Sequence, residues 1–389
     1  MSELRVGAIG IGARGGLAAA VNRPGLDAKV VAAADPTEPG QARAREWFGP
    51  DITTVADYHD LLTENLDAMV VTAPDFAHED IAIELLTAGI PVYLEKPLAI
   101  TIEGCDRVLE TARKHHTKLY VGHNMRHMSV VLKMRELITS GAIGEVKAIW
   151  CRHFVGHGGD FYFKTWHADR TKSTGLLLQK GAHDIDVIHW LAGGYTRRVA
   201  AMGALTLYGQ ITDRQDNSDR LRTEWAGGQW PPLSQRHLNP VVDVEDLSML
   251  NMALDNGVYA TYEQCHYTPD YWRNYTVIGT EGRIENFGDT GPDTVVRLWN
   301  KRTEYNPDGD VTIPITSGEG GHGGSDAAII AEFLRFVREG GTTNTSPVAA
   351  REAVATGVTA TNSLRSDGSA RDVPTLAPDL ITYFESGQA

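Results

Sequence analysis

Short apolar runs alternate with amphipathic stretches over the first 122 residues of the chain. The apolar runs have the length and side-chain types of strands, whereas the stretches between them repeat apolar positions at helical spacing. This alternation predicts a parallel sheet with helices on both faces, and the right-handed crossover rule limits its topology. The predicted strands are Arg5–Ile9, Lys29–Ala34, Ala68–Thr72, Pro91–Leu94 and Lys118–Val121, and the predicted helices are Gln41–Phe48, Glu79–Ala88 and Ile102–Lys114.

The pattern changes beyond about residue 124. A helix, Val130–Ser140, is followed by long segments of alternating polarity, and Asp255-Asn256-Gly257 between two of them is a hairpin signal. Such segments predict a largely antiparallel sheet with one open face and helices on the other. Ser325 or Asp326 is the expected N-cap of a later helix. The strand segments are Glu145–Phe154, Arg198–Gly209, Glu245–Leu254, Val258–Tyr267, Tyr275–Gly279 and Gly282–Phe287, and the last helices are Asp326–Glu339 and Pro347–Ser366.

The two patterns predict an α/β protein with two domains. Residues 1–124 are expected to form a doubly wound parallel sheet of the Rossmann type. Residues 125–389 are expected to form an α+β domain with the open-faced, largely antiparallel sheet. A charged segment, about 213–240, is predicted to be a long insertion between strands.

Composition narrows the class of protein. The chain has 389 residues and a formal net charge of −14, which argues against nucleic acid or an anionic membrane as a general partner. No apolar run reaches the length of a membrane span, and the N-terminus lacks the features of a secretory signal. Three cysteines, Cys105, Cys151 and Cys265, are odd in number and lack metal-ligand spacing, which indicates reduced thiols in a cytoplasmic protein.

A glycine pattern of the GxGxxG type follows the first strand. Gly10 permits a tight turn, Gly12 lets the backbone approach a pyrophosphate, and Gly15 lets helix and strand pack closely. The helical stretch Leu17–Val21 would offer its N-terminal N–H groups to the anion. Asp35 ends the second strand, where its carboxylate would accept ribose hydroxyls and repel a 2′-phosphate. NAD is therefore the predicted cofactor, ahead of NADP, and residues 1–124 are the predicted NAD(P)-binding domain.

Loops after neighbouring strands would complete this cofactor site, because ligands of such folds bind at the carboxyl edge of the sheet. Arg14 or Arg43 would soften the preference for NAD if either reached the ribose. The predicted cofactor contacts from these segments are Gly10, Gly12, Ala13, Arg14, Gly15, Asp35, Thr72, Pro74, His78, Glu95 and Lys96.

Lys96 stands at the same edge within Glu95-Lys96-Pro97. Pro97 restricts Lys96 to extended geometry. A lysine fixed there can donate a hydrogen bond to a substrate oxygen, or move protons when partly desolvated. A surface lysine before a loop proline is the alternative interpretation.

Together, Gly10–Gly15, Glu95-Lys96-Pro97 and Gly175–Asp186 resemble the Gfo/Idh/MocA family, the group of glucose-fructose oxidoreductase, inositol dehydrogenase and rhizopine-catabolism proteins. The resemblance extends over nearly the whole chain but does not specify a substrate. It implies a Rossmann domain followed by an open-faced sheet domain, and a cis bond before Pro97. It also implies that Lys96 binds substrate and takes part in catalysis, with His183 as the acid or base.

One position departs from the family pattern. Many members carry an aspartate four residues before the histidine, where this chain has Gln179, followed by Lys180. Glutamine can bind a hydroxyl but cannot raise the basicity of a histidine or relay a proton. Asp184 or Asp186 could take the place of the missing aspartate, or His183 and Lys96 could together carry out the proton transfer.

The residues themselves agree with a helical histidine site. In a helix over Leu176–Leu191, Gln179, His183 and Asp186 form one polar face. Oxidation of a secondary alcohol requires a base near neutral pH, and histidine suits that role. A histidine that crosses a domain interface is the alternative.

Two further segments supply candidate contacts. Val121–Arg126 resembles the family segment beside the nicotinamide, so Asn124 and Arg126 are predicted cofactor contacts, with interdomain hydrogen bonding as the alternative. Arg152–Tyr162 and Trp166 combine aromatic faces with polar groups, as a carbohydrate ring requires. The predicted substrate contacts are Lys96, His157, Trp166, Gln179, Lys180 and His183.

No metal is predicted, since the histidines show no strong ligand motif and the nicotinamide itself takes the hydride. The leading hypothesis is reversible NAD-dependent oxidation of a ring hydroxyl on a sugar, glycoside or cyclitol by a homo-oligomer. One alternative is cofactor-assisted glycoside cleavage through transient ring oxidation. Another is a non-catalytic dinucleotide-binding sensor.

Overall fold

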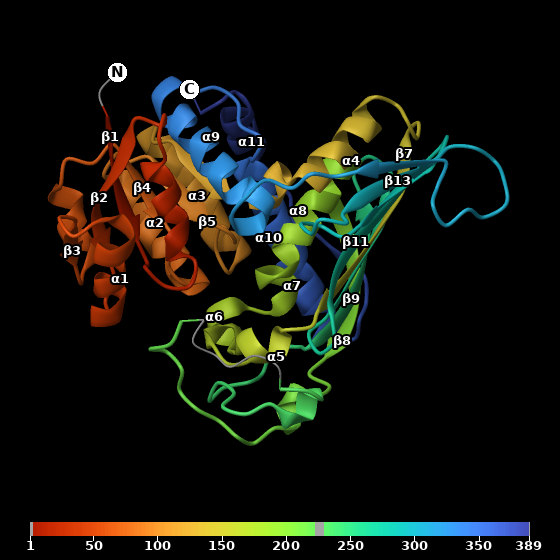
Figure 1. Cartoon of the computed structure of the whole chain (residues 1–389), viewed down its shortest axis with the longest axis horizontal. Coiled ribbons are helices and arrows are strands. Elements are labelled where there is room, and N and C mark those ends of the chain that lie inside the picture. Colours follow the sequence, from red (N-terminus) through yellow and green to blue (C-terminus); the bar gives the residue numbers. More distant parts are fainter. Residues whose placement is uncertain (1–2, 222–228, 389) are drawn as a thin grey trace.

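The first sheet is a six-stranded parallel sheet. A computed structural model of the chain describes residues 3–221 and 229–388, and Figure 1 shows its two sheets with helices between them. The strand order β3-β2-β1-β4-β5-β6, with every pair parallel, confirms the predicted Rossmann arrangement. The strands are β1 (Leu4–Ile9), β2 (Ala28–Ala34), β3 (Thr53–Val55), β4 (Ala68–Val71), β5 (Val92–Glu95) and β6 (Leu119–Gly122), of which only β3 was not predicted.

Helices from both ends of the chain cover this sheet. The 3₁₀ helix η1 (Gly15–Asn22), α1 (Glu38–Phe48) and α9 (Ser325–Glu339) cover one face, where Phe333 packs in the same cluster as Val6. The other face is covered by α2 (His78–Thr87), α3 (Ile102–His115) and α11 (Pro378–Glu385). Within the residues that the structure describes, no helix is long and apolar enough to cross a bilayer.

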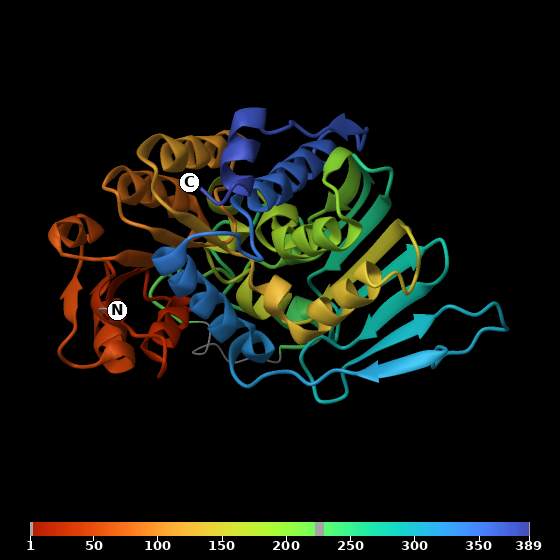
Figure 2. The same ribbon diagram turned by 90° about the horizontal axis from the view of Figure 1, so that it is seen from above.

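The second sheet has nine strands in the order β14-β13-β12-β11-β7-β10-β9-β8-β15. Only β7 and β10 pair in parallel, so the sheet is largely antiparallel, as predicted. Three helices cover one face, α4 (Ser129–Thr139), α8 (Gly181–Ala192) and α10 (Pro347–Leu364) (Figure 2). The strands are β7 (Val146–Val155), β8 (Thr196–Ala204), β9 (Leu247–Leu254), β10 (Tyr259–Cys265), β11 (Tyr271–Gly279), β12 (Arg283–Phe287), β13 (Val295–Trp299), β14 (Val311–Pro314) and β15 (Arg371–Asp372).

Several elements depart from the predicted bounds. β8 ends at Ala204 rather than Gly209, because the Asp246 carboxylate accepts the backbone N–H groups of residues 206 to 208 and turns the chain. β11 starts at Tyr271, where it already pairs with β7. The single helix predicted over Leu176–Leu191 is divided into α7 (Leu176–Gln179) and α8. The strands β13, β14 and β15 and the helix α11 were not predicted.

The described parts of the predicted insertion, residues 213–221 and 229–240, pack against a set of short helices that follow β7. Asn217 donates to Lys164 O at 3.0 Å, and Gln235 donates to Asp160 Oδ1 at 2.9 Å. Residues 222–228 of this segment lie outside the described residues. The remaining short helices of the fold are η2 (Tyr58–Thr63), η3 (Asp75–Ala77), η4 (Asn124–His127), α5 (Gly158–Phe161), η5 (Trp166–Ala168), α6 (Arg170–Ser173), η6 (Tyr208–Gln210), η8 (Pro232–Ser234) and η9 (Gly321–Gly324).

Candidate active site

The glycine turn after β1 combines close backbone packing with open space. Gly10 has φ +84°, and a Cβ there would lie 2.5 Å from Ala73 N, so only glycine fits. A Cβ on Gly12 would meet nothing within 4 Å. Thr72 Oγ1 donates to Gly10 O at 2.7 Å and ties the turn to the end of β4. The residues present fit a dinucleotide, because a fixed turn leaves room for a pyrophosphate at Gly12.

Asp35 is buried beside this turn at the end of β2. Its Oδ2 accepts Ile11 N at 2.8 Å, and its Oδ1 accepts Thr37 N at 2.9 Å and Thr37 Oγ1 at 2.6 Å. Oδ2 has a further acceptor position, so the carboxylate can also accept a ribose hydroxyl. Arg43 Nε donates to Ile11 O at 2.9 Å, which brings a cation to the same turn.

Arg14 links the turn to two distant segments. Its Nε donates to Glu95 Oε1 at 2.6 Å, and its two terminal nitrogens donate to the Asp326 oxygens at 2.7 Å each. Asn124 Nδ2 also donates to Asp326 Oδ1, at 2.9 Å. Burial opposes the ionisation of Asp326, but the hydrogen bonds from Arg14 and His322 hold its pKa well below the usual range. Of the predicted cofactor residues, Arg14 and Asn124 therefore meet at the Asp326 carboxylate, and Arg14 joins Glu95 to them.

The role of Asp326 corrects a sequence prediction. Gly324 stands at the N-cap of α9, and no side chain caps the helix, so the N-cap prediction for Ser325 or Asp326 is wrong. A cavity of about 470 Å³ lies beside the turn, between η1 and residues 319 to 327, with Arg14 and Asp326 in its wall. Asp326 thus serves as the anchor of Arg14 at the rim of the turn.

His78 and Pro74 hold the neighbouring loop. The two ring nitrogens of His78 lie 2.7 Å from Pro97 O and 2.9 Å from Ala73 O, and the residue is fully buried. Burial lowers the pKa of His78, while the contacts with the Pro97 and Ala73 carbonyl oxygens oppose that shift, and the ring bridges the loops after β4 and β5. Pro74 precedes η3 with extended backbone. Both predicted cofactor residues shape the loop that carries Asp75.

Lys96 extends from the end of β5 to the helix of the second domain. The Lys96–Pro97 bond is cis, as the family resemblance implies. Lys96 Nζ donates to Gln179 O at 2.9 Å, which joins the end of β5 to α7. Burial lowers the pKa of Lys96, and the Asp75 carboxylate is the strongest of the groups that oppose this shift. Lys96 is thus a desolvated amine placed between the two sheets.

Asp75 belongs to this site, although sequence reasoning did not select it. The residue is 5% exposed, and its carboxylate receives a hydrogen bond from the Gln179 side chain. Burial raises the pKa of Asp75 to about 7, against the influence of Lys96. The sequence signal that could have identified Asp75 was its position in the loop directly after β4. That strand neighbours β5, so the loops after both strands meet at the carboxyl edge of the sheet.

His183 lies in the first turn of α8, close enough to Lys96 for their charges to interact. Its Nδ1 has no hydrogen-bond partner among the described residues. Burial lowers the pKa of His183 well below its usual value, and Lys96 and Lys180 lower it further. The imidazole is therefore neutral near pH 7 and able to accept a proton. Lys180 itself lies with Nζ 5.7 Å from the centre of the Tyr162 ring.

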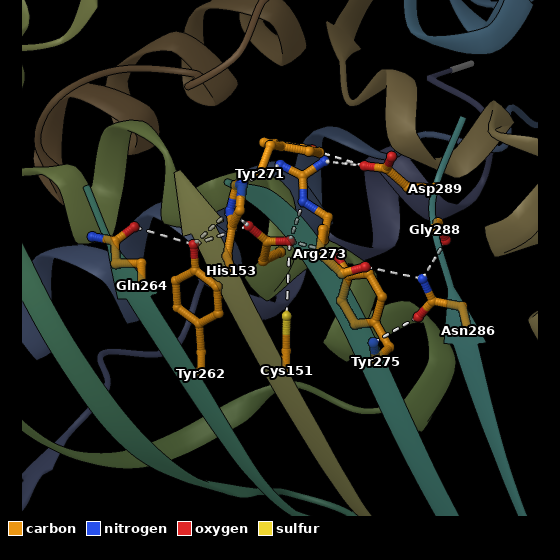
Figure 3. Close-up of polar contacts among 11 residues, drawn as sticks. Cys151, His153, Tyr262, Gln264, Tyr271, Arg273, Tyr275, Asn286, Gly288 and Asp289 are labelled. Carbon is orange, nitrogen blue, oxygen red and sulfur yellow. Dashed lines mark hydrogen bonds and ion pairs between the residues drawn. The ribbon is translucent and has the colours of Figure 1, made fainter. Parts of the chain in front are cut away.

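The two aspartates after His183 do not compensate for Gln179, because other groups hold both of them. Asp184 accepts His153 Nδ1 at 3.0 Å and Tyr262 OH at 2.9 Å, and pairs with Arg273 Nε at 3.0 Å. Figure 3 shows side chains from β7, β10 and β11 converging on this point, with Tyr275 and Cys151 completing the group. Burial opposes ionisation of Asp184, but Arg273 and His153 hold its pKa far below the usual range.

Asp186 points instead towards the segment that joins the domains. Arg126 donates to both Asp186 oxygens at 2.7 Å and to Asn344 O at 2.8 Å, and His123 Nδ1 lies 3.1 Å from Asp186. Arg126 is 5% exposed. The donors of this predicted cofactor residue are engaged within the protein, and they join η4 to α8 and to the loop before α10.

The predicted sugar contacts lie among aromatic rings. The His157 ring stacks on Tyr271 with ring centres 6.0 Å apart. Trp166 stacks on His167 at 3.8 Å and meets Phe76 edge-on at 5.8 Å. Phe76 follows Asp75 in the first domain, so the Phe76–Trp166 contact brings an aromatic pair from both domains to the same side of the site. The exposed Phe76 was not selected from the sequence.

A parallel sheet, a glycine turn and a lysine at its carboxyl edge define a dinucleotide-binding oxidoreductase. Residues 4–123 match the family model described as the oxidoreductase family, NAD-binding Rossmann fold, and residues 135–371 match the C-terminal alpha/beta domain of the same family. The chain belongs to the Gfo/Idh/MocA family. This result confirms the predicted family and its NAD-binding domain.

Curated relatives match the chain over different lengths. YteT of Bacillus subtilis (strain 168), a protein named as an oxidoreductase without an assigned substrate, is 27% identical over 307 residues. The match covers 69% of this chain and 72% of YteT. The 2,7-anhydro-N-acetylneuraminate hydratase of Mediterraneibacter gnavus is 31% identical over 45% of this chain and 46% of its own length. Inositol 2-dehydrogenase of Salmonella typhimurium is 29% identical over 42% and 46%. The chain thus matches about half the length of these two enzymes.

Solved structures share the whole fold. Levoglucosan dehydrogenase, in complex with NADH and levoglucosan, superposes with a TM-score of 0.78 at 19% identity and covers 96% of this chain and 100% of its own. The myo-inositol 2-dehydrogenase of Lactobacillus plantarum has a TM-score of 0.74 at 20% identity, with the same coverage. Identities this low show the fold alone.

The Asp184 group predicts a large stability effect. Asp184→Asn removes the nearer charge partner of the buried Arg273 guanidinium and leaves only Asp289 at 3.7 Å, which should lower the free energy of unfolding by about 3 kcal/mol. Equilibrium urea unfolding measures the loss. Lys133→Ala, which removes the exposed pair with Glu136, is the control and should cost no more than about 1 kcal/mol. Equal effects of the two substitutions would contradict a central role for Asp184.

The carboxylate at the end of β2 predicts a change in cofactor preference. Asp35→Asn keeps the side-chain shape but removes the charge that repels a 2′-phosphate, so the preference for NADH over NADPH should fall about tenfold, or 1.4 kcal/mol. Titration of tryptophan fluorescence with each cofactor measures the ratio. Asp51→Asn, at an exposed position, is the control. An unchanged ratio in Asp35→Asn would remove Asp35 from the ribose site.

Proposed function

We propose that this protein is an NAD-dependent dehydrogenase that oxidises a ring secondary alcohol of a sugar, glycoside or cyclitol. The observation that carries the proposal is the approach of Lys96 and His183 from separate domains, with the Lys96 amine bonded to Gln179 O at 2.9 Å. The two side chains are close enough for their charges to interact, and Glu95, next to Lys96, is bonded to Arg14 of the glycine turn. The names of the inositol and levoglucosan dehydrogenases support a polyhydroxylated ring as substrate.

Each group has a distinct part in the reaction. Bound NAD supplies a hydride acceptor. Lys96 donates a hydrogen bond to the reacting oxygen and polarises it, and the neutral His183 imidazole accepts the hydroxyl proton. Gln179 and Lys180 help to orient the ring, with His157 and Trp166 as its aromatic neighbours. The glycine turn, Asp35, Thr72 and Asn124 would hold the cofactor.

Cofactor-assisted glycoside cleavage is a second candidate. In that reaction, transient oxidation acidifies a neighbouring C–H, and elimination releases the protonated aglycone and leaves a C=C bond. Water then adds across that bond, and the hydride returns to the carbonyl carbon. Two observations favour it: the relative named as a hydratase of an anhydro-sugar acid, and the absence of a carboxylate at position 179. It would use the same lysine and histidine.

Turnover measurements test these roles. With NAD, myo-inositol, levoglucosan and p-nitrophenyl glucosides serve as probes, and NADH absorbance and p-nitrophenol release are followed together. Lys96→Met and His183→Gln should each lower kcat by at least about 100-fold, because each removes a group that handles the reacting O–H, while NADH affinity is retained.

The controls are Lys301→Met and His59→Gln, which alter exposed residues of the same types and should leave turnover unchanged. Release of p-nitrophenol without net NADH formation would favour the cleavage reaction. Wild-type turnover in both site variants would overturn the assigned roles. Binding of NADH with no turnover of any probe would favour a dinucleotide-binding sensor.

The open face of the second sheet supports a homo-oligomer. Trp150, Met202, Met249 and Tyr259 lie on this face and are 52%, 67%, 44% and 69% exposed. Met202 and Met249 are direct cross-strand neighbours on β8 and β9. Exposed apolar side chains gathered on one face are typical of an interface, and we propose a second copy of the chain as the partner.

Sedimentation velocity tests this interface. The double substitution Met202→Glu/Met249→Glu places charges in the apolar patch and should shift the protein from oligomer to monomer. The control is Tyr305→Glu, which alters a residue that is 78% exposed in the loop between β13 and β14 and should not change the assembly state. A monomeric wild type, or an unchanged oligomer in the double variant, would contradict the proposal.

The thiols bear on the cellular compartment. Cys105 and Cys151 are buried and Cys265 is partly buried, and all three are free. Free thiols are typical of reducing compartments, so we infer a cytoplasmic protein.

A further inference from the structure

Asp75 is a buried carboxylate with one oxygen unused. The residue is 5% exposed, and its Oδ2 has no hydrogen-bond partner among the described residues. An unpaired buried oxygen is costly, so its retention beside Lys96 and Gln179 calls for a function. The mechanism above assigns it none.

The hydrogen bond from Gln179 fixes the direction of the amide. An ionised Asp75 can only accept, so the Gln179 amide nitrogen is the donor. Gln179 Oε1 is accordingly left without a partner in the described structure. The amide thus supports the charged form of Asp75, while the backbone oxygen of the same residue accepts the Lys96 amine. One residue holds both groups in place.

The surrounding charges make Asp75 the available anion. The pKa of Lys96 is raised by the charges of Asp75, Tyr162 and Glu95 and lowered by that of Lys180. Of these, Glu95 is already paired with Arg14 at 2.6 Å. Asp75 has no ion pair within 4.0 Å among the described residues, Lys96 included, so its charge acts on Lys96 over a longer distance. Because the pKa of Asp75 is raised to about 7, that charge is fully present only above neutral pH.

Around His183 the balance is positive. Lys96, Lys180 and Arg273 all lower its pKa, together with His123. Asp184 pairs with Arg273, but within the part of the chain that the structure describes, His183 Nδ1 has no hydrogen-bond partner. A negative charge near Lys96 would partly cancel the positive charge of the lysine ammonium. Because that ammonium lowers the pKa of His183, the negative charge would make it easier for His183 to accept a proton.

We propose that Asp75 is a positioning residue that keeps Lys96 protonated and aimed at the reacting oxygen, so that the first domain supplies the negative charge that Gln179 lacks. This inference rests on the proposed dehydrogenase function. The hydride still passes from carbon to the nicotinamide, and the hydroxyl proton still passes to His183. Asp75 forms no bond to the substrate and acts through the Lys96 ammonium.

The test measures the protonation of Lys96 directly and needs no substrate. The whole protein is labelled with acetic anhydride over a range of pH, and acetylation of the Lys96 peptide is quantified by mass spectrometry. Asp75→Asn keeps the acceptor for Gln179 but removes the charge, so the pKa of Lys96 should fall. At a pH below that pKa, a fall of one unit increases the neutral amine, and hence the labelling rate, about tenfold.

Three controls separate charge from structure. Lys301, an exposed lysine in the same sample, should label identically in all variants. Asp75→Glu keeps the charge and should stay near the wild-type curve. In the double variant Asp75→Asn/Gln179→Asp, the carboxylate is moved to the partner side of the same hydrogen bond, and the Lys96 curve should return towards wild type. NADH binding verifies that each variant is folded.

An unchanged Lys96 curve in a folded Asp75→Asn variant would overturn the inference. So would a curve for Asp75→Glu or the double variant that matches Asp75→Asn, because the effect would then come from shape rather than charge. If the shift is found but no probe is turned over, the proposed reaction fails while the role of Asp75 in setting the state of Lys96 stands. The two results are therefore distinguishable.

Discussion

The Asp184 carboxylate is the interaction on which the geometry of this protein depends. It lies in the helix that carries His183 and receives donors from three strands of the second sheet. A buried charge is tolerated only when its partners are complete, so the helix can dock on the sheet in one register alone. Because His183 is the residue before Asp184, this docking also fixes the position of His183.

Asp186 fixes the same helix from its other side. Because it faces Arg126, the helix is tied both to the sheet and to the segment that leaves the first domain. The two carboxylates flank Ile185, which is itself buried. Their combined effect is to set the distance between an amine on one domain and an imidazole on the other, which a flexible interdomain hinge could not do.

The sequence allowed the framework to be predicted, but not the partners of the charged residues. Apolar periodicity located β1, β2, β4, β5 and β6 and most of the second sheet, because burial of strands leaves a local pattern. The glycine turn and Lys96 carry local motifs as well. The partners of Asp75, Asp184 and Arg126 carry no such motif, because they are distant along the chain, and the sequence does not distinguish a buried aspartate from an exposed one. The short strands β3, β14 and β15 escaped for a related reason, since few of their residues are buried.

The link between Arg14 and Asp326 has a consequence for how the protein is made. These residues are 312 positions apart, and the carboxylate at the later one completes the surroundings of the glycine turn. A ribosome must therefore release about five-sixths of the polypeptide before the nucleotide cradle acquires its final wall. Until then, the glycine turn lacks the carboxylate that pairs with Arg14, so the surroundings of the turn are complete only once residue 326 has been made.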